Sequence, residues 1–353
     1  MELSQVRSYK NLYIVSLVFL TLALAVILYY SMNKTIEISN VAQDEVVSGA
    51  DKVSGTDDDN INHLKFGNTE GNVDYLAIPL PEKFNAENIE IQNHYMDSEL
   101  YIFLKDSEAS FFKEAILKGN HSNITSGRYE ETDDGCELVF AMDGIYEYKS
   151  VLENNELYIT FLQPGELYEK IVVIDPAGGG SNDGVSANGV VEKNVSLAVA
   201  KELKKLLDES DVKAYYTRMD DVNPKEESRV RLANDTKADM YIRIEADSKA
   251  DETVYGVTAD YNSDYFIPGF GNVELADVME YEVVSEIKGK ALGLEKAPIT
   301  SYALIHSSVP GTAIKVGCVT NKQEAILLGR DDYIAKIAQG IYNGIIRAYE
   351  ENE

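Results

Sequence analysis

Three charged residues lie at or near the ends of short, mainly apolar runs. Asp175 follows the apolar run 171–174, Glu245 follows the run 240–244, and Lys315 lies within a third run. If these runs are parallel strands, their carboxyl ends share one edge of a sheet, which is where open α/β sheets bind ligands. Carboxylates there can bind a metal ion or transfer a proton, and a lysine supplies positive charge.

The elements that must position these side chains alternate between strands and helices. Strands are predicted over 171–174, 212–216, 240–244, 302–305 and 313–316, and helices over 194–207, 226–237, 273–292 and 333–349. This alternation is typical of a mostly parallel, twisted sheet with helices on both faces. We therefore expect an α/β domain over residues 169–353.

Residues 73–168 show a different rhythm, with short apolar stretches separated by turn-forming residues. Strands are predicted over 75–80, 89–92, 100–104, 138–142, 146–148 and 157–161, and several alternate with a period of two. We expect a small, mostly β domain. A β-sandwich spacer without a ligand explains this pattern as well as a binding module does.

The N-terminal run 12–30 is uncharged, almost wholly apolar, and long enough as a helix to cross a membrane. Arg7 and Lys10 precede it and acidic residues follow it. The positive-inside rule therefore places residues 1–11 in the cytoplasm and the C-terminal domains outside. A cleaved signal peptide is the alternative, but the run is longer than a normal signal region and no small-residue cleavage pattern follows. We interpret it as a single-pass transmembrane anchor in the cytoplasmic membrane.

The charge and composition of the chain exclude several classes of protein. Residues 31–72 are rich in Asp, Glu, Ser, Gly and Asn, which predicts an extended acidic linker. The chain has 60 acidic and 32 basic residues and a formal charge of −28, which disfavours binding to nucleic acid. Its two cysteines, Cys136 and Cys318, lie in different halves, so neither a disulfide framework nor a thiolate zinc site is expected.

Between residues 171 and 346 the chain contains VVIDPAGGGSNDG with a following EKN, then TRMDD, RLANDTKADMYIRIEADS and VPGTAIKVGCVTN. In these segments the chain resembles the zinc-dependent N-acetylmuramoyl-L-alanine amidases of bacterial cell walls. The order and spacing of the segments follow the family's Ile-Asp-Pro-Gly-His-Gly-Gly, Glu-Lys, Thr-Arg, Arg-x-x-x-Ala-Asn, Ser-Ile-His-Ala-Asn and Glu-x-Gly-Phe motifs. The upstream β-rich domain resembles AMIN-type modules, which bind envelope glycans, only in position and strand rhythm.

In that family two histidines and one carboxylate hold Zn²⁺, and a second carboxylate acts as the base. The resemblance assigns the first histidine to Gly178, the carboxylate ligand to Glu192, the second histidine to Glu245 and the base to Lys315. Only Glu192 keeps the family's residue type. A glycine cannot coordinate, a glutamate suits harder ions than zinc, and a lysine opposes a bound cation. We therefore expect no bound cofactor, zinc included.

Asp175, Arg231, Arg243 and Asn234 complete the pocket that the resemblance implies. The alternation along the strand from residue 240 puts Arg243 on the same face as Glu245. We expect Lys315, together with Arg243, to occupy the space of the metal and to pair with Glu192 or Glu245. The alternative is a lysine that extends into solvent.

Three functions fit these observations. The first is a membrane-anchored, extracytoplasmic pseudoenzyme that binds peptidoglycan or a wall-remodelling partner. The second is an active peptidoglycan amidase in which Asp175, Glu192 and Glu245, with or without His306, hold a different metal. The third is a purely structural interaction module. The glycine-rich stretch GGGSNDG lacks the Lys-Ser/Thr of a phosphate-binding loop, which disfavours a nucleotide site.

Overall fold

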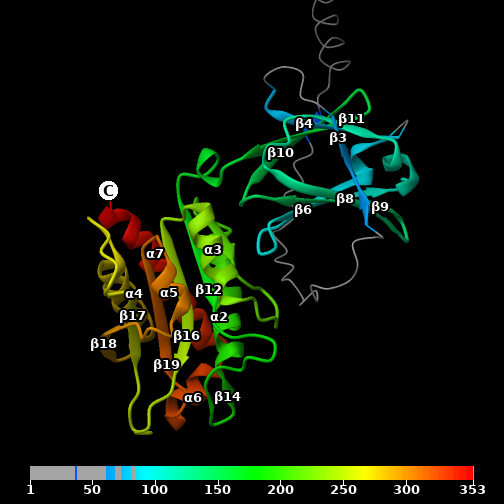
Figure 1. Ribbon diagram of the computed structural model, residues 1–353. Helices are drawn as coiled ribbons and strands as arrows, with labels where there is room; N and C mark the ends of the chain where they lie inside the picture. Colours follow the sequence, from blue (N-terminus) through cyan, green and yellow to red (C-terminus); the bar gives the residue numbers. More distant parts are fainter. Residues whose placement is uncertain (1–35, 38–60, 68–72, 82–83, 353) are drawn as a thin grey trace, which may run out of the picture.

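The computed structural model describes residues 36–37, 61–67, 73–81 and 84–352, which form a β-rich domain and an α/β domain (Figure 1). The predicted anchor over 12–30 and most of the predicted linker lie outside the described residues. Among the residues that the structure does describe, no helix is both long enough and apolar enough to cross a membrane.

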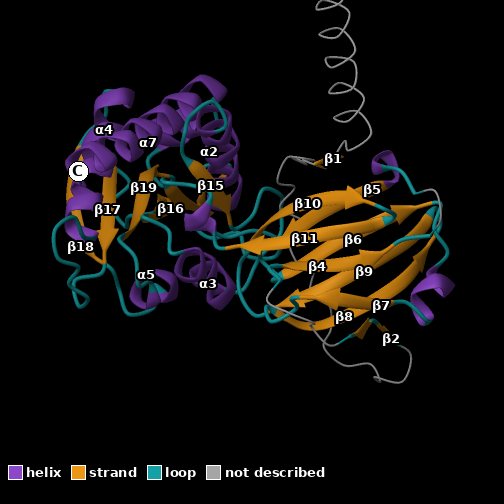
Figure 2. Ribbon diagram, turned by 90° about the horizontal axis from the view of Figure 1, so that it is seen from above, coloured by secondary structure: helices purple, strands orange, loops and turns teal. Residues whose placement is uncertain are grey.

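The β-rich domain is a sandwich of two sheets (Figure 2). One sheet has the order β1-β10-β11-β4-β7-β3 and the other the order β2-β8-β9-β6-β5. The strands are β1 (Ile36–Glu37), β2 (Asn62–His63), β3 (Lys65–Phe66), β4 (Tyr75–Pro79), β5 (Ile89–His94), β6 (Glu99–Lys105), β7 (Ile116–Gly119), β8 (Ile124–Thr132), β9 (Gly135–Met142), β10 (Glu147–Glu153) and β11 (Glu156–Leu162). Short 3₁₀ helices η2 (Ala86–Asn88), η3 (Ala109–Lys113) and η4 (Pro164–Glu166) join some of them.

The core of this domain lies between the two sheets. Leu76 and Ile159 from the first sheet pack in one apolar cluster with Ile102 and Phe140 from the second. Strands are present at all six predicted positions. The strand β8 was not predicted, because its sequence ITSGRYEET buries only two of nine side chains and offers few apolar residues to a pattern search.

The α/β domain has one six-stranded sheet in the order β15-β12-β16-β19-β17-β18. Its strands are β12 (Ile171–Pro176), β15 (Lys213–Tyr216), β16 (Met240–Asp247), β17 (Val257–Tyr261), β18 (Ala291–Lys296) and β19 (Gly311–Cys318), and a hairpin of β13 (Ser186–Ala187) and β14 (Val190–Val191) follows β12. The strands β15, β12, β16 and β19 are parallel, as predicted. The strand β17 is antiparallel to β19 and parallel to β18, so the sheet is mixed.

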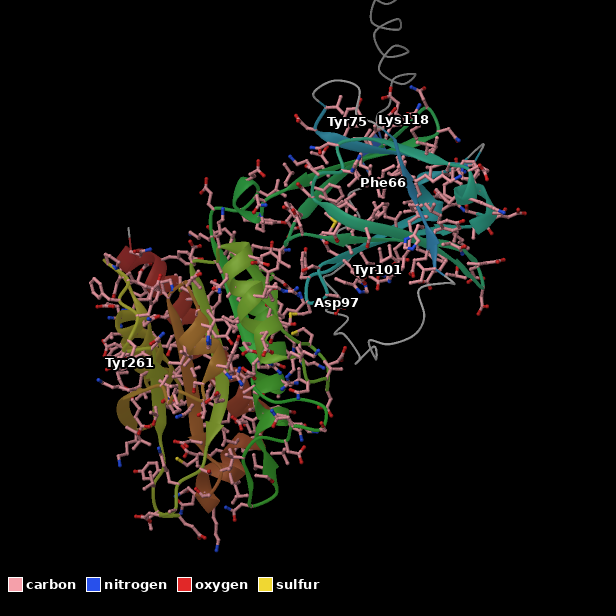
Figure 3. The ribbon with its side chains drawn as sticks, in the orientation of Figure 1. Phe66, Tyr75, Asp97, Tyr101, Lys118 and Tyr261 are labelled. Carbon is pink, nitrogen blue, oxygen red and sulfur yellow. The ribbon has the colours of Figure 1, made fainter. Side chains whose placement is uncertain are left out.

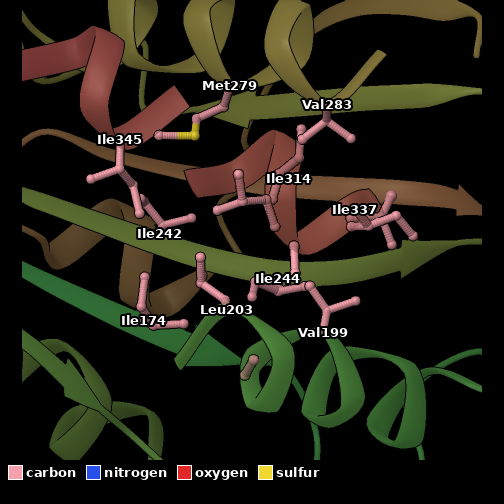
Figure 4. Packing of buried hydrophobic residues seen from close by; sticks show 14 of the residues in the cluster. Ile174, Val199, Leu203, Ile242, Ile244, Met279, Val283, Ile314, Ile337 and Ile345 are labelled. Atoms are coloured by element: carbon pink, nitrogen blue, oxygen red, sulfur yellow. The ribbon is translucent and has the colours of Figure 1, made fainter. Parts of the chain in front are cut away.

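Helices cover both faces of this sheet, as predicted (Figure 2). They are α2 (Glu192–Leu207), α3 (Glu226–Thr236), α4 (Asn272–Ile287), α5 (Tyr302–His306), α6 (Lys322–Leu328) and α7 (Asp331–Asn352). On one face α2, α4 and α7 pack against the strands. Val199 and Leu203 of α2 and Ile337 of α7 meet Ile244 and Ile314 of the sheet there (Figure 4). On the other face lie α3 and α5.

Two sequence predictions in this domain are wrong. Residues 302–305 form the helix α5 rather than a strand, because a four-residue apolar run has no period that distinguishes the two. The helix predicted over 273–292 ends at Ile287, where Lys288 adopts a left-handed conformation with φ of 53°, and residues 291–296 continue as β18. Neither β17 nor β18 was predicted.

The two ends of the sheet differ in what surrounds them. The helix α6 and the strand β14 lie at the end where the parallel strands finish (Figure 1). The β-rich domain lies beside the opposite end, where β12 and β15 begin (Figure 1).

Candidate functional site

Asp175, at the end of β12, is a buried charge at the centre of the candidate site, with 0% of its surface exposed. Its Oδ1 accepts hydrogen bonds from Thr217 Oγ1 at 2.5 Å and from Arg229 Nη1 at 2.5 Å. Its Oδ2 accepts from Arg243 Nη1 at 2.7 Å and from the hydroxyl of Tyr241. Burial alone would raise the pKa of Asp175, but the charges of Arg229 and Arg243 outweigh it, so the pKa lies well below its usual range.

Two fully buried arginines hold the glycine-rich loop that follows Asp175. Arg218 donates to the carbonyl oxygens of Pro176 at 2.9 Å and Ala177 at 2.8 Å. Arg229 donates to those of Pro176 at 3.0 Å and Gly178 at 2.8 Å. Buried carbonyl groups need such partners, so the two guanidinium groups determine the path of the loop.

The path of the loop leaves no room for a side chain at Gly178. Its φ is +72°, in the left-handed region, and a Cβ atom there would lie 2.8 Å from the carbonyl oxygen of Asn182 and 3.0 Å from Cβ of Lys193. A histidine at this position therefore requires the loop to move.

Glu192, the first residue of α2, is buried beneath the same loop. Its Oε2 accepts from the backbone N–H of Val185 at 2.8 Å, and its Oε1 accepts from that of Ala246 at 3.1 Å. Burial and the nearby charge of Glu245 raise the pKa of Glu192. The carboxylate thus joins the loop to the end of β16.

Arg243 occupies the space between three carboxylates. Its Nε donates to Glu245 Oε1 at 2.9 Å, and its Nη1 donates to Asp175 and to Glu226 Oε2, the latter at 2.9 Å. Burial alone would lower the pKa of Arg243, but these carboxylates raise it well above its usual range. The expected pairing of Arg243 with Glu245 is therefore present.

Lys315 on β19 pairs with a carboxylate that the sequence did not suggest. Its Nζ lies 2.7 Å from Oδ2 of Asp260 on β17, while no ion pair joins it to Glu192 or Glu245. The prediction that Lys315 pairs with one of those two glutamates is wrong. Burial alone would lower the pKa of Lys315, but Asp260 outweighs it and raises the pKa. Burial raises the pKa of Asp260 despite the lysine.

A row of alternating charge crosses four strands. It consists of Asp175 on β12, Arg243 and Glu245 on β16, Lys315 on β19 and Asp260 on β17. Asp175 is the register partner of Arg243, and Glu245 is the register partner of Lys315. With Asp260 at the far end, the signs run negative, positive, negative, positive, negative. Each charge thus has an opposite charge beside it, which offsets the cost of removing it from water.

Besides Gly178 and Glu192, which belong to the loop beside this row, three residues named from the sequence lie away from it. Arg231 donates through Nη2 to the carbonyl oxygen of Met96 in the β-rich domain at 2.5 Å. Asn234 donates to the carbonyl oxygen of His306 at 3.1 Å, close to the start of β19. His306 itself stacks on the ring of Tyr302 at 4.0 Å.

Several residues of the site were missed from the sequence, Glu226 and Asp260 among them, and for three others the motifs were noticed. Thr217 and Arg218 are the Thr-Arg step of TRMDD, and Arg229 is the arginine that stands four residues before Ala233. That spacing, rather than the nearer Arg231, matches the Arg-x-x-x-Ala-Asn motif.

The residues present do not fit a zinc site. Position 178 offers no donor atom, the Glu192 carboxylate accepts two backbone N–H groups, and Glu245 faces the guanidinium of Arg243. Zinc prefers histidine and cysteine ligands in tetrahedral geometry. Within the described part of the chain, no group of three or more His, Cys, Asp or Glu side chains is arranged to hold a metal ion.

The fold and these motifs define an amidase-type α/β domain, and comparisons with known proteins agree. The sequence profile of the N-acetylmuramoyl-L-alanine amidase family matches residues 172–347. The chain is 30% identical over 182 residues to the uncharacterized protein YqiI of Bacillus subtilis, covering 52% of this chain and 86% of that protein. It is 27% identical over 221 residues to the germination-specific N-acetylmuramoyl-L-alanine amidase of the same bacterium, covering 59% and 90%.

A solved N-acetylmuramoyl-L-alanine amidase from Clostridium difficile 630 is 26% identical, with a TM-score of 0.49, and the match covers 52% of this chain and 98% of that one. On the family profile and the curated relatives, this chain belongs to the N-acetylmuramoyl-L-alanine amidase family.

The central carboxylate gives a first test. Asp175→Asn removes the nearest counter-charge of the buried Arg229 and leaves it Glu226 at 3.7 Å, so we expect the free energy of unfolding to fall by about 3–5 kcal/mol at pH 7. Because the folded-state pKa of Asp175 is depressed, this stabilisation is present above about pH 4 and is lost as the pH falls further. Urea unfolding from pH 7 to pH 3 should show the difference between wild type and variant shrinking in acid.

The matched control for this test is Asp211→Asn, which changes an exposed carboxylate paired with Lys170 and should leave the unfolding midpoint nearly unchanged. Equal midpoints for wild type and Asp175→Asn at pH 7 would contradict the central role of Asp175.

The unexpected ion pair gives a second test. Lys315→Met leaves the buried Asp260 without its partner, and we expect the free energy of unfolding to fall by about 3 kcal/mol. Adding Asp260→Leu removes the stranded charge and should recover most of the loss, since an apolar pair can replace a buried ion pair. Chemical denaturation of the single and double variants measures both effects. A double variant that is less stable than Lys315→Met would contradict the pairing.

Proposed function

We propose that this chain is a membrane-anchored, extracytoplasmic pseudoenzyme of the amidase family that binds peptidoglycan or a wall-remodelling protein without cleaving the muramoyl-L-alanine amide. One observation carries the proposal. The positions where the family's motifs have two metal ligands and a base hold Gly178, Glu245 and Lys315, and the two charged residues are engaged in ion pairs of their own.

The proposed inactivity rests on what amide hydrolysis of this type requires. A metal ion lowers the pKa of its bound water, and a carboxylate base takes the proton. Lys315 carries a positive charge and donates to Asp260, so it offers no basic atom to a water molecule. Losing metal and base together removes two contributions of several kcal/mol each to transition-state stabilisation.

The arrangement also argues against a simple return to activity. Gly178→His, Glu245→His and Lys315→Glu together restore the family's residue types. The new glutamate at position 315 would lie beside Asp260, whose Oδ2 is 2.7 Å from Nζ of Lys315 in this chain, so two negative charges would meet. Arg243 would lose its partner Glu245. A histidine at position 178 additionally meets the backbone of Asn182. We therefore expect the triple variant to need further changes at Arg243 and Asp260.

An active hydrolase with a rearranged metal site is the competing function. It needs Asp175, Glu192 and Glu245 to hold the metal, but Asp175 and Glu245 are both paired with Arg243. His306, the optional further ligand, stacks on Tyr302 near the start of β19, whereas the glutamates lie at the carboxyl ends of the strands. No observation favours this alternative.

The hydrolytic reaction gives a direct test of the proposal. We expect the detergent-solubilised full chain, incubated with peptidoglycan and added Zn²⁺, to release no free L-alanine amino termini, while an active amidase of the family serves as the positive control. Elemental analysis of the same preparation should find no stoichiometric metal.

Co-sedimentation with peptidoglycan sacculi then separates the binding functions. Retention of the protein on the sacculi supports peptidoglycan as its ligand. Failure to sediment with them supports a wall-remodelling protein as its partner instead. Release of L-alanine termini by the unmodified protein would overturn the proposed inactivity.

The proposed topology is tested separately from the chemistry. If residues 12–30 span the membrane with Arg7 and Lys10 inside, protease added to intact, wall-stripped cells should digest the C-terminal domains. A protein that resists digestion until the cells are lysed, and that fractionates with the soluble cytoplasm, would contradict the topology.

A further inference from the structure

The two domains meet around one lysine. Lys213, the first residue of β15, has only 13% of its side chain exposed, and its Nζ lies 3.5 Å from Oε1 of Glu147 on β10. The ring centroids of Tyr95, Tyr168 and Tyr215 lie 5.7, 5.1 and 4.9 Å from the same nitrogen. Tyr95 and Glu147 belong to the β-rich domain, Lys213 and Tyr215 belong to the α/β domain, and Tyr168 lies in the segment that connects the two. A cation over aromatic faces is attracted by the negative potential of the rings, and more strongly when it is desolvated.

Glu147 ties the same cluster together through its hydrogen bonds. It is buried, and its Oε1 accepts from the hydroxyl of Tyr95 at 2.9 Å, within the β-rich domain. The same oxygen accepts from the hydroxyl of Tyr215 at 2.5 Å, across the domain boundary. A buried carboxylate is costly unless it is paired and hydrogen-bonded, and here the charge partner and one hydroxyl belong to the α/β domain.

An apolar seam continues this contact. Met96 and Ile145 of the β-rich domain belong to one buried cluster with Ile171 and Val230 of the α/β domain. The turn that carries Met96 and Asp97 lies beside α3, and Figure 3 shows Asp97 there. Arg231 on α3 donates to the carbonyl oxygen of Met96, which attaches the backbone of the turn to the helix.

We propose that the two domains move as one rigid body and that the caged pair of Lys213 and Glu147 holds them together. Domains joined by small polar interfaces ordinarily move relative to each other. This interface instead buries a charge pair among three aromatic rings beside a shared apolar cluster. The connection is also short, since β11 ends at Leu162, η4 begins at Pro164 and β12 starts at Ile171.

The rigid joint has a functional consequence that does not depend on whether the amidase site is active. Lys213 and Ile171 stand at the start of the parallel strands, whereas Asp175, Glu245 and Lys315 lie toward their carboxyl ends. A ligand bound at the charged row is therefore held at a constant distance and direction from the β-rich domain. The carboxyl ends of the parallel strands, near α6 and β14, lie at the end of the sheet away from that domain (Figure 1).

Distance measurements between two spin labels test the proposal on the full chain. Labels at Lys113→Cys in η3 and Lys336→Cys in α7 report on the two domains, since both lysines are exposed and the native Cys136 and Cys318 are buried. We expect one narrow distance distribution in the otherwise unmodified protein. A broad or bimodal distribution would overturn the rigid joint.

Variants of the lysine then test its role as the holding residue. In Lys213→Met we expect the distribution to widen at least about twofold, and in Lys213→Arg, which keeps the cation, to stay narrow. Lys205→Met changes an exposed lysine paired with Glu202 and should have no effect.

If Lys213→Met fails to fold by circular dichroism, Glu147→Gln replaces it, because glutamine keeps the shape and an acceptor but loses the charge. A distribution that stays as narrow in Lys213→Met or Glu147→Gln as in wild type would overturn the assignment of the caged pair.

Discussion

The pairing of the buried carboxylate of Asp175 with two guanidinium groups is the interaction on which the rest of the site depends. Arg229 and Arg243 approach it from α3 and β16, so one side chain at the end of β12 aligns a helix and a neighbouring strand. A charge with no exposed surface is tolerated only with such partners. Arg229 then extends the same network to the glycine-rich loop, whose carbonyl groups would otherwise be buried without donors.

The charged row shows how carboxylates at an amidase-type strand edge can be balanced by positive side chains of the same chain. Negative side chains brought together at such an edge repel each other, and a bound cation normally relieves the repulsion. Here Arg243 and Lys315 supply that positive charge from the protein itself, each between or beside carboxylates. Glu192 differs, because its carboxylate accepts hydrogen bonds from two backbone N–H groups and its pKa is raised by burial and by Glu245.

The two ends of the α/β sheet carry different groups of buried ion pairs. The end where the strands finish carries the row of charges and the loop that covers Glu192. The end where they begin is joined to the β-rich domain through the ion pair of Lys213 with Glu147 and through the apolar cluster that contains Met96. Both ends use buried ion pairs, but the first set lies within one domain and the second joins two. Stability and domain orientation can therefore be altered separately, at residues far apart along the strands.

The sequence by itself determined the layout of the α/β domain, the parallel strands β12, β15, β16 and β19 and the helices α2, α3 and α7. The reason is that short runs rich in β-branched and aromatic residues alternate with segments of clear helical periodicity. It also determined which family positions had changed residue type. Only the tertiary structure decided the partners: Lys315 meets Asp260 because β17, whose five residues have no distinctive pattern, inserts antiparallel beside β19. The tertiary structure also places Arg231 at the domain boundary and Arg229 at Asp175. Two arginines that are two residues apart on a helix point in different directions, and the sequence alone did not show which one faces Asp175.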